Sequence, residues 1–136
     1  MVETDGNVLG AVRTFTLTRE APAAARHFAV ATIGHWGAEN LADDVALVVT
    51  ELAANAVRHA RSGFTIVLSA CRNVLRIAVR DASPLPSGGA DAVLKPAPLH
   101  GLCAVQAMAR RWGVEPLGSL GKTVWVELSL VTPAET

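Results

Sequence analysis

The chain of 136 residues is long enough for one domain and too short for two. Hydrophobic residues make up 51% of it and charged residues 18%, which predicts a substantial apolar core. Twelve basic residues balance twelve acidic ones, and no basic stripe of the kind that grips a phosphate backbone is present. We therefore expect no direct contact with nucleic acid and no attraction to an anionic membrane surface.

Features that would place the chain in or across a membrane are missing from the sequence. No apolar run reaches the roughly 20 residues that a membrane-spanning helix needs. The first ten residues, MVETDGNVLG, have neither the basic start nor the apolar stretch of a signal peptide. Cys71 and Cys103 match no zinc or disulfide pattern, and each is expected to be a buried small hydrophobic residue. These features favour a cytoplasmic location.

The first part of the chain predicts a strand and then a helix. Residues 11–18 are rich in β-prone side chains and predict the strand. Pro22 suits the first turn of a helix and Gly37 its end. Between them, the apolar face recurs at helical spacing and consists of Phe28, Ala29, Thr32, Ile33 and Trp36.

A second helix is predicted from about Asn40, as its N-cap, to about Ala60. Asp43 and Asp44 lie in its first turn, where the helix dipole favours carboxylates. Its core stripe has the spacing of one helical face and consists of Leu41, Val45, Val48, Leu52 and Ala56.

Three polar residues, Glu51, Asn55 and His59, continue this apolar stripe. At about 100° per residue, Asn55 and His59 fall within roughly 20° of Val48, and Glu51 lies roughly 60° away. Burying such groups without partners costs on the order of 1–3 kcal/mol each. They form either a core cluster bonded to neighbouring backbone or a ligand site. Asparagine is a poor ligand for transition metals, but it suits a Mg²⁺ ion that also holds phosphates.

Residues 64–71 and 74–81 predict two strands joined by a short turn at Arg72-Asn73, and hence an antiparallel hairpin. One face of the second strand carries Leu75, Ile77 and Val79. The period of two places Asp81 next on that inward face. This carboxylate either caps its own turn or receives a ligand.

The last part of the chain predicts a loop, a helix and a strand. Residues 82–99 form a Pro/Gly-rich segment of a length that is usually functional or disordered. A helix is predicted over residues 100–112, with Arg110 and Arg111 at its C-terminal dipole and Gly113 at its end. The apolar side of this helix consists of Leu102, Val105, Met108, Ala109 and Trp112. The inward face of a strand over residues 122–130 consists of Val124, Val126, Leu128 and Leu130.

Because the strands come in antiparallel pairs with helices between them, one layer of helices over a sheet is the economical packing. We expect an α+β fold, a two-layer α/β sandwich whose mixed, mostly antiparallel sheet is covered on one face by about three helices. Residues 11–130 are expected to form this single domain, and residues 1–10 and 131–136 to be flexible ends.

Four segments resemble the motifs of the GHKL, or Bergerat-fold, ATPases. ELAANAVRHA at 51–60 resembles the N-box, and RDASPLPS at 80–87 stands where that class has its Asp-x-Gly adenine motif. HGLCAVQAMARRWG at 100–113 resembles the glycine-rich lid and its following helix, and GKTVWVEL at 121–128 the closing strand. In order and spacing the chain is similar to the small bacterial anti-sigma-factor serine/threonine kinases, across about residues 11–130.

The resemblance implies an ATP-binding kinase with ATP and Mg²⁺ as cofactors. In this comparison Glu51 is the general base and Asn55 the Mg²⁺ ligand. Arg58 and His59 lie near the phosphates.

The remaining implied contacts come from later in the chain. Asp81 accepts the hydrogen bond from the adenine amino group, with Ser83 beside it in the adenine motif. Gly101 and Leu102 offer lid backbone to the phosphates at a helix N-terminus, which favours anions.

The chain also departs from the family pattern. Ser83 replaces the glycine of Asp-x-Gly, and Leu99 replaces the first glycine of the lid. Directly after the glycine of the closing strand, where the family often has an inward threonine, the chain has Lys122. Thr123 lies one residue after the position of the family's threonine, and it is expected to face the side of the strand away from the core.

Two classes of function follow from these motifs. The first is a kinase that phosphorylates a serine on an anti-anti-sigma (STAS-type) partner and also binds a sigma factor, with homodimers possible. The second is a non-catalytic module of the same fold that acts through protein partners and binds nucleotide weakly or not at all. A detached histidine-kinase catalytic domain is disfavoured by the short chain and the lack of dimerisation helices.

Overall fold

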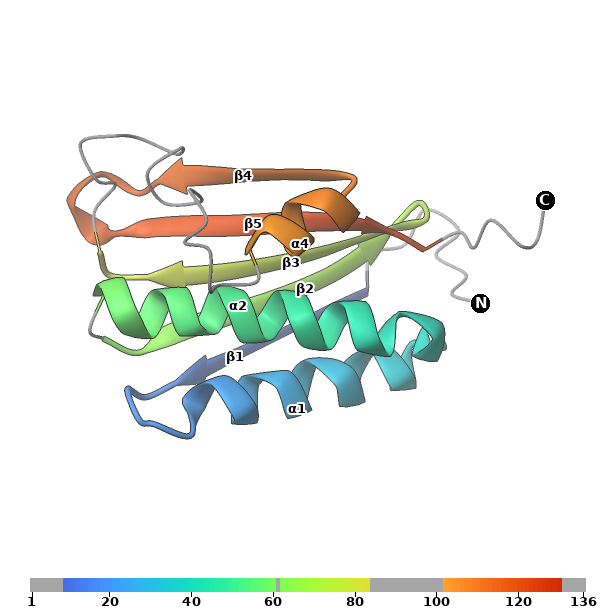
Figure 1. Cartoon of the computed structure of the whole chain (residues 1–136), viewed down its shortest axis with the longest axis horizontal. Helices are drawn as coiled ribbons and strands as arrows, with labels where there is room; N and C mark the ends of the chain where they lie inside the picture. Colours follow the sequence, from blue (N-terminus) through green and yellow to red (C-terminus); the bar gives the residue numbers. More distant parts are fainter. Residues whose placement is uncertain (1–8, 61, 84–101, 131–136) are drawn as a thin grey trace.

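The computed structural model describes residues 9–60, 62–83 and 102–130, which form an α+β sandwich (Figure 1). Its elements in chain order are β1 (Leu9–Phe15), α1 (Ala21–His35), α2 (Ala42–Ala60), β2 (Phe64–Cys71), β3 (Val74–Asp81), α4 (Leu102–Met108), β4 (Arg111–Pro116) and β5 (Lys122–Ser129). Short 3-10 turns precede α2 at Glu39–Leu41 and β5 at Gly118–Leu120. None of the described helices has the length and apolar character needed to cross a membrane.

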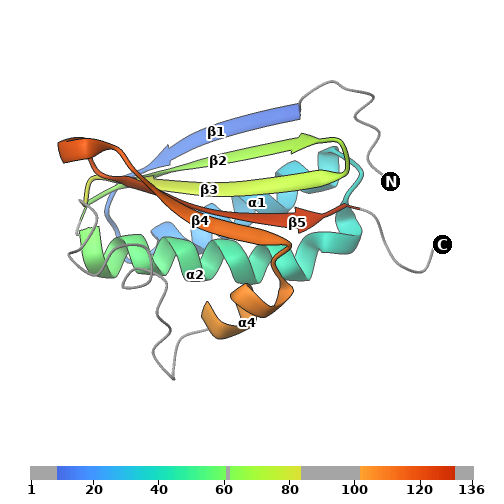
Figure 2. The same ribbon diagram turned by 90° about the horizontal axis from the view of Figure 1, so that it is seen from above.

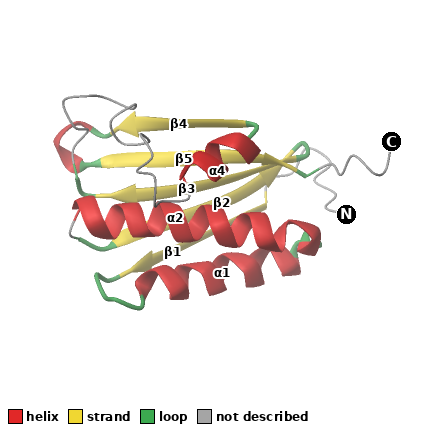
Figure 3. Ribbon diagram, in the orientation of Figure 1, coloured by secondary structure: helices red, strands yellow, loops and turns green. Residues whose placement is uncertain are grey.

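The five strands pair in the order β1-β2-β3-β5-β4, and all of these pairings are antiparallel. Helices α1 and α2 lie side by side on one face of this sheet, and α4 packs next to α2 on the same side (Figures 1 and 2). No described helix covers the other face, as the colouring by secondary structure also shows (Figure 3). The two-layer sandwich expected from the sequence is therefore confirmed, with an antiparallel rather than a mixed sheet.

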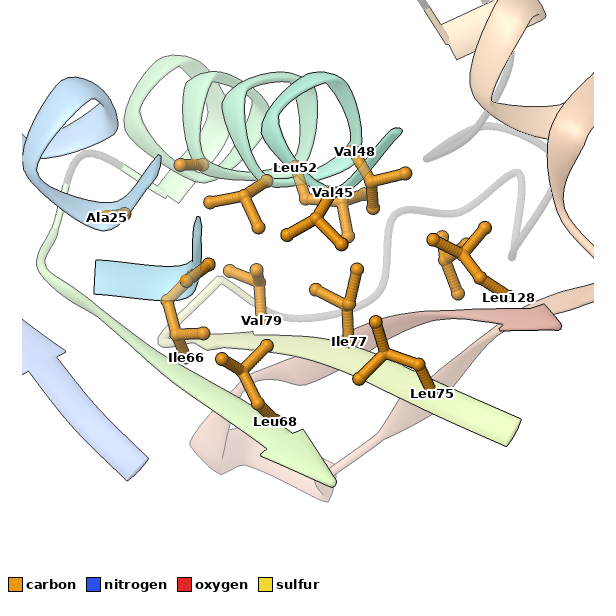
Figure 4. Packing of buried hydrophobic residues seen from close by; sticks show 14 of the residues in the cluster. Ala25, Val45, Val48, Leu52, Ile66, Leu68, Leu75, Ile77, Val79 and Leu128 are labelled. Atoms are coloured by element: carbon orange, nitrogen blue, oxygen red, sulfur yellow. The ribbon is translucent and has the colours of Figure 1, made fainter. Parts of the chain in front are cut away.

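The core lies between α2 and the central strands. Val45, Val48 and Leu52 project from one stripe of α2 toward Ile77 and Val79 on β3 (Figure 4). All five residues predicted on the α2 stripe are buried, because a helical repeat keeps them on the side that faces the sheet. Fully burying one such side chain contributes about 1.5–3 kcal/mol. This stripe therefore fixes α2, and with it the polar residues of its last turns, over β3.

Helix α1 packs largely through small side chains. Its buried residues recur at every fourth position and are Ala21, Ala25, Ala29 and Ile33. Ala29 and Ile33 belong to the predicted apolar face, whereas Phe28, Thr32 and Trp36 are only partly buried. Three of these four buried residues are alanines, whose short side chains let α1 lie close to its neighbours.

Both ends of α1 lie where local sequence signals predict them, but the start of α2 does not. Pro22 lies in the first turn of α1, and Gly37 follows the helix with a φ of 80°. The amides of Gly37 and Ala38 donate to carbonyls of the last turn at 3.1 and 2.9 Å, which is a common way for a helix to end at glycine. Asn40, however, lies in a 3-10 turn and α2 begins at Ala42, so Asn40 is not the N-cap that was predicted.

Strands β2 and β3 form the predicted hairpin with the predicted boundaries. Arg72 and Asn73 have φ values of 52° and 66°. Two successive positive φ angles give a type I′ turn, whose twist matches that of the paired strands. Strand β1 covers residues 9–15 instead of 11–18, because its backbone pairs with β2 from Leu9 to Phe15.

Residues 111–116 form a strand where the sequence predicted the end of a helix. Helix α4 stops at Met108, and β4 then pairs with β5, with Trp112 opposite Val126 on the side of the core. The backbone groups of β5 gain hydrogen-bond partners from this pairing, which no local periodicity reveals. The residues expected at the helix terminus thus lie in or beside a strand: Arg110, Arg111 and Gly113.

The face of the sheet without helices carries a stacked arginine–tryptophan cluster. The guanidinium carbons of Arg76 and Arg111 lie 4.4 and 5.6 Å from the ring centre of Trp125. Both arginines also pair with Glu127, at 3.6 and 3.8 Å. Cys71 is a free and only partly buried cysteine, not the buried one expected, because the alternation of β2 turns its last residue away from the helices.

We predict that Gly113→Ala lowers the stability of the protein, whereas Gly34→Ala raises it. A Cβ at Gly113 would lie 2.6 Å from Cζ2 of Trp125, so the ring would have to move, at a cost of about 1–3 kcal/mol. Gly34 lies in α1 with no atom within 4 Å of an added Cβ, so alanine gains up to about 1 kcal/mol of helix propensity there. Urea unfolding measures both changes. A stabilised Gly113→Ala variant would contradict the assignment of residues 111–116 to a strand.

Candidate functional site

The polar residues singled out in the sequence gather at one end of the sandwich. The last turns of α2, the end of β3 and the start of β5 all lie at this end (Figure 1). Helix α2 packs directly on β3, and its C-terminal turns lie at the same end of the sandwich as the end of that strand (Figure 1). The site is thus built from one helix and two neighbouring antiparallel strands.

Helix α2 contributes Glu51 and Asn55, four residues apart and therefore about 6 Å apart along the helix axis. Asn55 is buried, with 3% of its surface exposed, and Glu51 is partly buried. Both follow the apolar stripe of α2, as the periodicity predicted. Arg58, one turn further on, is exposed. The helix therefore presents a buried amide, a partly exposed carboxylate and an exposed guanidinium along its last turns.

Strand β3 contributes Asp81, which is buried and on the side of the helices, as predicted. The backbone amide of Ser83 donates a hydrogen bond of 2.8 Å to the Oδ1 atom of Asp81. The carboxylate therefore caps its own turn, one of the two interpretations that the sequence allowed. The proposed role in binding adenine stays a prediction.

The main partner of Asp81 is Lys122, at the start of β5. Its Nζ atom donates to both Oδ1 and Oδ2, each at 3.0 Å. The side chains of both residues are 3% exposed. Lys122 follows the glycine of the closing strand directly, and no sequence motif predicts its pairing with Asp81.

The backbone around Lys122 explains how the two side chains meet. Asp81 and Lys122 are direct partners in the antiparallel register of β3 and β5. Gly121, with a φ of 130°, lies so close to β3 that a Cβ there would overlap the carbonyl oxygen of Asp81. Lys122 also has the inward phase of Val124, since alternate residues share a face. That phase was the sequence signal that could have identified Lys122 as a buried lysine in need of an anionic partner.

Several predicted site residues lie outside the described part of the chain. Nothing is described of Gly101 or of residues 84–100, which hold most of the Pro/Gly segment, nor of residues 1–8 and 131–136. The same holds for the side chains of His59, Leu102 and Cys103, although their backbone is described.

The two ends of the site differ in how well they fit ATP and Mg²⁺. The Glu51 and Asn55 oxygens on α2 are of the hard type that Mg²⁺ prefers, with water and phosphate oxygens completing its shell. Within the described ranges, no three His, Cys, Asp or Glu side chains gather to hold a metal ion by themselves. At the strand end, three hydrogen bonds already fill most of the roughly four acceptor positions of the Asp81 carboxylate. The helix end therefore carries oxygen atoms of the type that Mg²⁺ prefers, whereas the carboxylate at the strand end is already bonded within the chain.

We predict strong coupling between Asp81 and Lys122 in folding stability. Asp81→Asn or Lys122→Met alone should cost about 3–5 kcal/mol, because either change leaves a buried group without its partner. The double variant should lose much less than the sum of the two. Urea unfolding of all four proteins gives the coupling free energy.

Glu115→Gln is the matched control for this cycle. It removes the pair between Arg76 and Glu115, whose side chains are 34% and 58% exposed, and should cost no more than about 1 kcal/mol. Additive losses in the Asp81/Lys122 cycle would show that the buried pair contributes no more than this surface pair.

Comparison with known proteins shows the fold but not the family. No protein-family model matches the chain, and no curated protein matches it in sequence. Eleven chains of solved structures match. One is the crystal structure of the RsbU and RsbW domains of Rv1364c from Mycobacterium tuberculosis, with a TM-score of 0.65 and 17% identity over 89% of this chain and 32% of that one. The chain thus spans about a third of that protein, and at this identity the likeness shows that the two share a fold.

Proposed function

We propose that the chain is an anti-sigma-type regulatory protein that binds ATP·Mg²⁺ and transfers the γ-phosphoryl group to a serine of a partner protein. The observation that carries this proposal is the pair on α2: a buried Asn55 one turn from a partly exposed Glu51, at the end of the apolar stripe. A helix that served packing alone would have no need of a carboxylate and an amide on its core side, since their burial costs free energy.

The two residues have different roles in the proposed reaction. Phosphoryl transfer requires mainly positioning and charge stabilisation, with a base that directs the attacking hydroxyl. Asn55 would hold Mg²⁺ through its amide oxygen, and the bound ion would neutralise phosphate charge. Glu51, which is partly exposed, would take the proton of the partner's serine hydroxyl. The serine oxygen would then bond to the γ-phosphorus as the bond from that phosphorus to ADP breaks. Arg58 is exposed and would attract the phosphates from the mouth of the site.

The proposed partners are a STAS-type anti-anti-sigma protein, as phosphoryl acceptor, and a sigma factor. The motif resemblance and the fold shared with a protein that contains RsbU and RsbW domains support this choice. A cytoplasmic location and a possible homodimer belong to the same proposal.

A second candidate function is a non-catalytic module that acts only by binding protein partners. The salt bridge between Asp81 and Lys122 favours it, because the carboxylate expected to read the base is already bonded within the chain. Glu51 and Asn55 favour the kinase. The two functions differ in whether the chain binds ATP·Mg²⁺ and transfers phosphate.

Asn55→Ala should remove the Mg²⁺ dependence of ATP binding, because the variant loses the amide oxygen proposed to hold the ion. Calorimetric titration of ATP with and without Mg²⁺ measures this dependence. Asp43→Asn is the control, since Asp43 is an exposed carboxylate in the first turn of the same helix and should keep the parent's behaviour. If Asn55→Ala bound ATP·Mg²⁺ as tightly as the parent, Asn55 would not be the metal ligand.

Glu51→Gln should leave ATP binding nearly intact and lower phosphoryl transfer by about 10²–10⁴-fold, the usual effect of losing a positioned base. The assay is transfer to a purified STAS-type protein, with intrinsic ATP hydrolysis measured in parallel because it needs no partner. Sigma-factor binding in a pull-down should survive the change. Equal transfer by parent and variant would exclude the catalytic role of Glu51. Sigma-factor binding with neither transfer nor hydrolysis in the parent would establish the non-catalytic module.

A further inference from the structure

The carboxylate at the strand end of the site accepts three hydrogen bonds from within the chain. Asp81 accepts two hydrogen bonds from the Lys122 ammonium and one from the Ser83 amide, all between 2.8 and 3.0 Å. With both side chains 3% exposed, an external ligand reaches this carboxylate only if a group of the chain moves. Of the two donors, the Ser83 amide is fixed by the turn, whereas a lysine side chain has several rotatable bonds.

The position of Lys122 is built into the backbone. Lysine is rarely buried unless it is paired, and here the strand register sets it directly opposite Asp81. The close approach of Gly121 to the Asp81 backbone requires a residue without a Cβ. The ammonium therefore arrives at the carboxylate through strand pairing, with no need for a bound molecule to bring the two together.

We propose that Lys122 is an internal competitor for the amino group of a nucleotide base, and that a base occupies the strand end only when the ammonium leaves Asp81. This inference rests on the proposed function, and on the contact with the adenine amino group that the motif resemblance implies for Asp81. An exocyclic amino group and a lysine ammonium both donate N–H bonds to a carboxylate, so they compete for the same oxygens. Because the ammonium carries a charge, its hydrogen bonds are the stronger, and the closed arrangement is favoured.

Two consequences distinguish this arrangement from an open base site. The contacts of the phosphates and metal on α2 must supply the free energy that opens the strand end, so affinity for the nucleotide is reduced by the population of the closed state. Removing the ammonium should therefore tighten the binding of ligands that carry the base and leave base-free phosphates unaffected. If Lys122 itself bound the nucleotide, removing its ammonium would instead weaken the binding of these ligands.

The test is calorimetric titration of the parent and Lys122→Met with ATP·Mg²⁺, adenosine and tripolyphosphate·Mg²⁺. Methionine keeps an unbranched apolar side chain and removes the charge. We expect ATP·Mg²⁺ and adenosine to bind about tenfold or more tightly to the variant, the effect of one charge-assisted hydrogen bond, with no change for tripolyphosphate·Mg²⁺. Arg80→Met is the matched control, because Arg80 is the exposed neighbour of Asp81 on β3 and its loss should change none of the affinities.

Each other result of the titration has a definite meaning. Equal or weaker binding of ATP·Mg²⁺ by Lys122→Met, with measurable binding by the parent, would overturn the role of Lys122 and leave the proposed function standing. No binding of ATP·Mg²⁺ by either protein would overturn the proposed function and the inference with it.

A second measurement uses the parent protein and does not depend on the variant's stability. The chain has two lysines, Lys95 and Lys122, so ¹⁵N NMR of the side-chain ammonium groups gives few signals to assign. A buried, paired ammonium exchanges its protons slowly with water. We expect saturating ATP·Mg²⁺ to abolish the slow exchange of the Lys122 signal, and tripolyphosphate·Mg²⁺ to leave it slow. Slow exchange that persists at full ATP occupancy would overturn the proposal, since the base would then bind without displacing the ammonium.

Discussion

The salt bridge between Asp81 and Lys122 is the interaction on which the end of the sheet depends. Each of these charges faces the apolar side of the sandwich, and either one alone would be costly there. Their pairing therefore links several features that would otherwise be independent: the register of β3 and β5, the close approach of Gly121, and the turn closed by Ser83. A buried pair of this kind is weak evidence for added stability, but it strongly penalises any register that separates the two charges.

Helix α2 serves the core and the candidate site with one continuous face. Val48 and Leu52 anchor it over β3, and the same stripe leads on to Asn55. The position of the amide relative to the sheet is thus set by apolar packing, with no contribution needed from a loop. Residues held by helices and strands are placed more accurately than residues held by loops, which is what a metal or phosphate site requires. The two ends of the site are nevertheless in different states, because the helix end presents oxygen ligands while the strand end is closed by Lys122.

The likeness to a solved structure at 17% identity illustrates which properties a fold preserves. The sandwich requires only that the apolar stripes of α1 and α2 meet the inward faces of the strands, and many sequences satisfy this requirement. Chemistry depends on far fewer positions. A threonine, a lysine or a small residue at position 122 would suit the same sheet but give quite different surroundings to Asp81. We therefore propose that Glu51, Asn55 and the Asp81–Lys122 pair decide the function of this chain.

The sequence by itself determined the features that repeat locally. The helical period identified the core stripe of α2 and the inward Asn55, the strand period placed Asp81 on the inward face, and Arg72-Asn73 located the hairpin turn. These predictions were correct because a period fixes the face of an element regardless of what that face meets.

Only the tertiary structure decided what each face would meet. The predicted helix reached residue 112, but residues 111–116 form β4, because the edge of β5 offers backbone partners that helix formation would leave unused. Lys122 has an inward phase in the sequence, yet its partner lies 41 residues away and is defined only by the pairing of β3 with β5. The choice between an Asp81 open to a ligand and one bonded within the chain was equally out of reach of any local pattern. Pairing between distant segments is set by the free energy of the whole sheet, and for that reason the state of the site was a property of the fold rather than of its motifs.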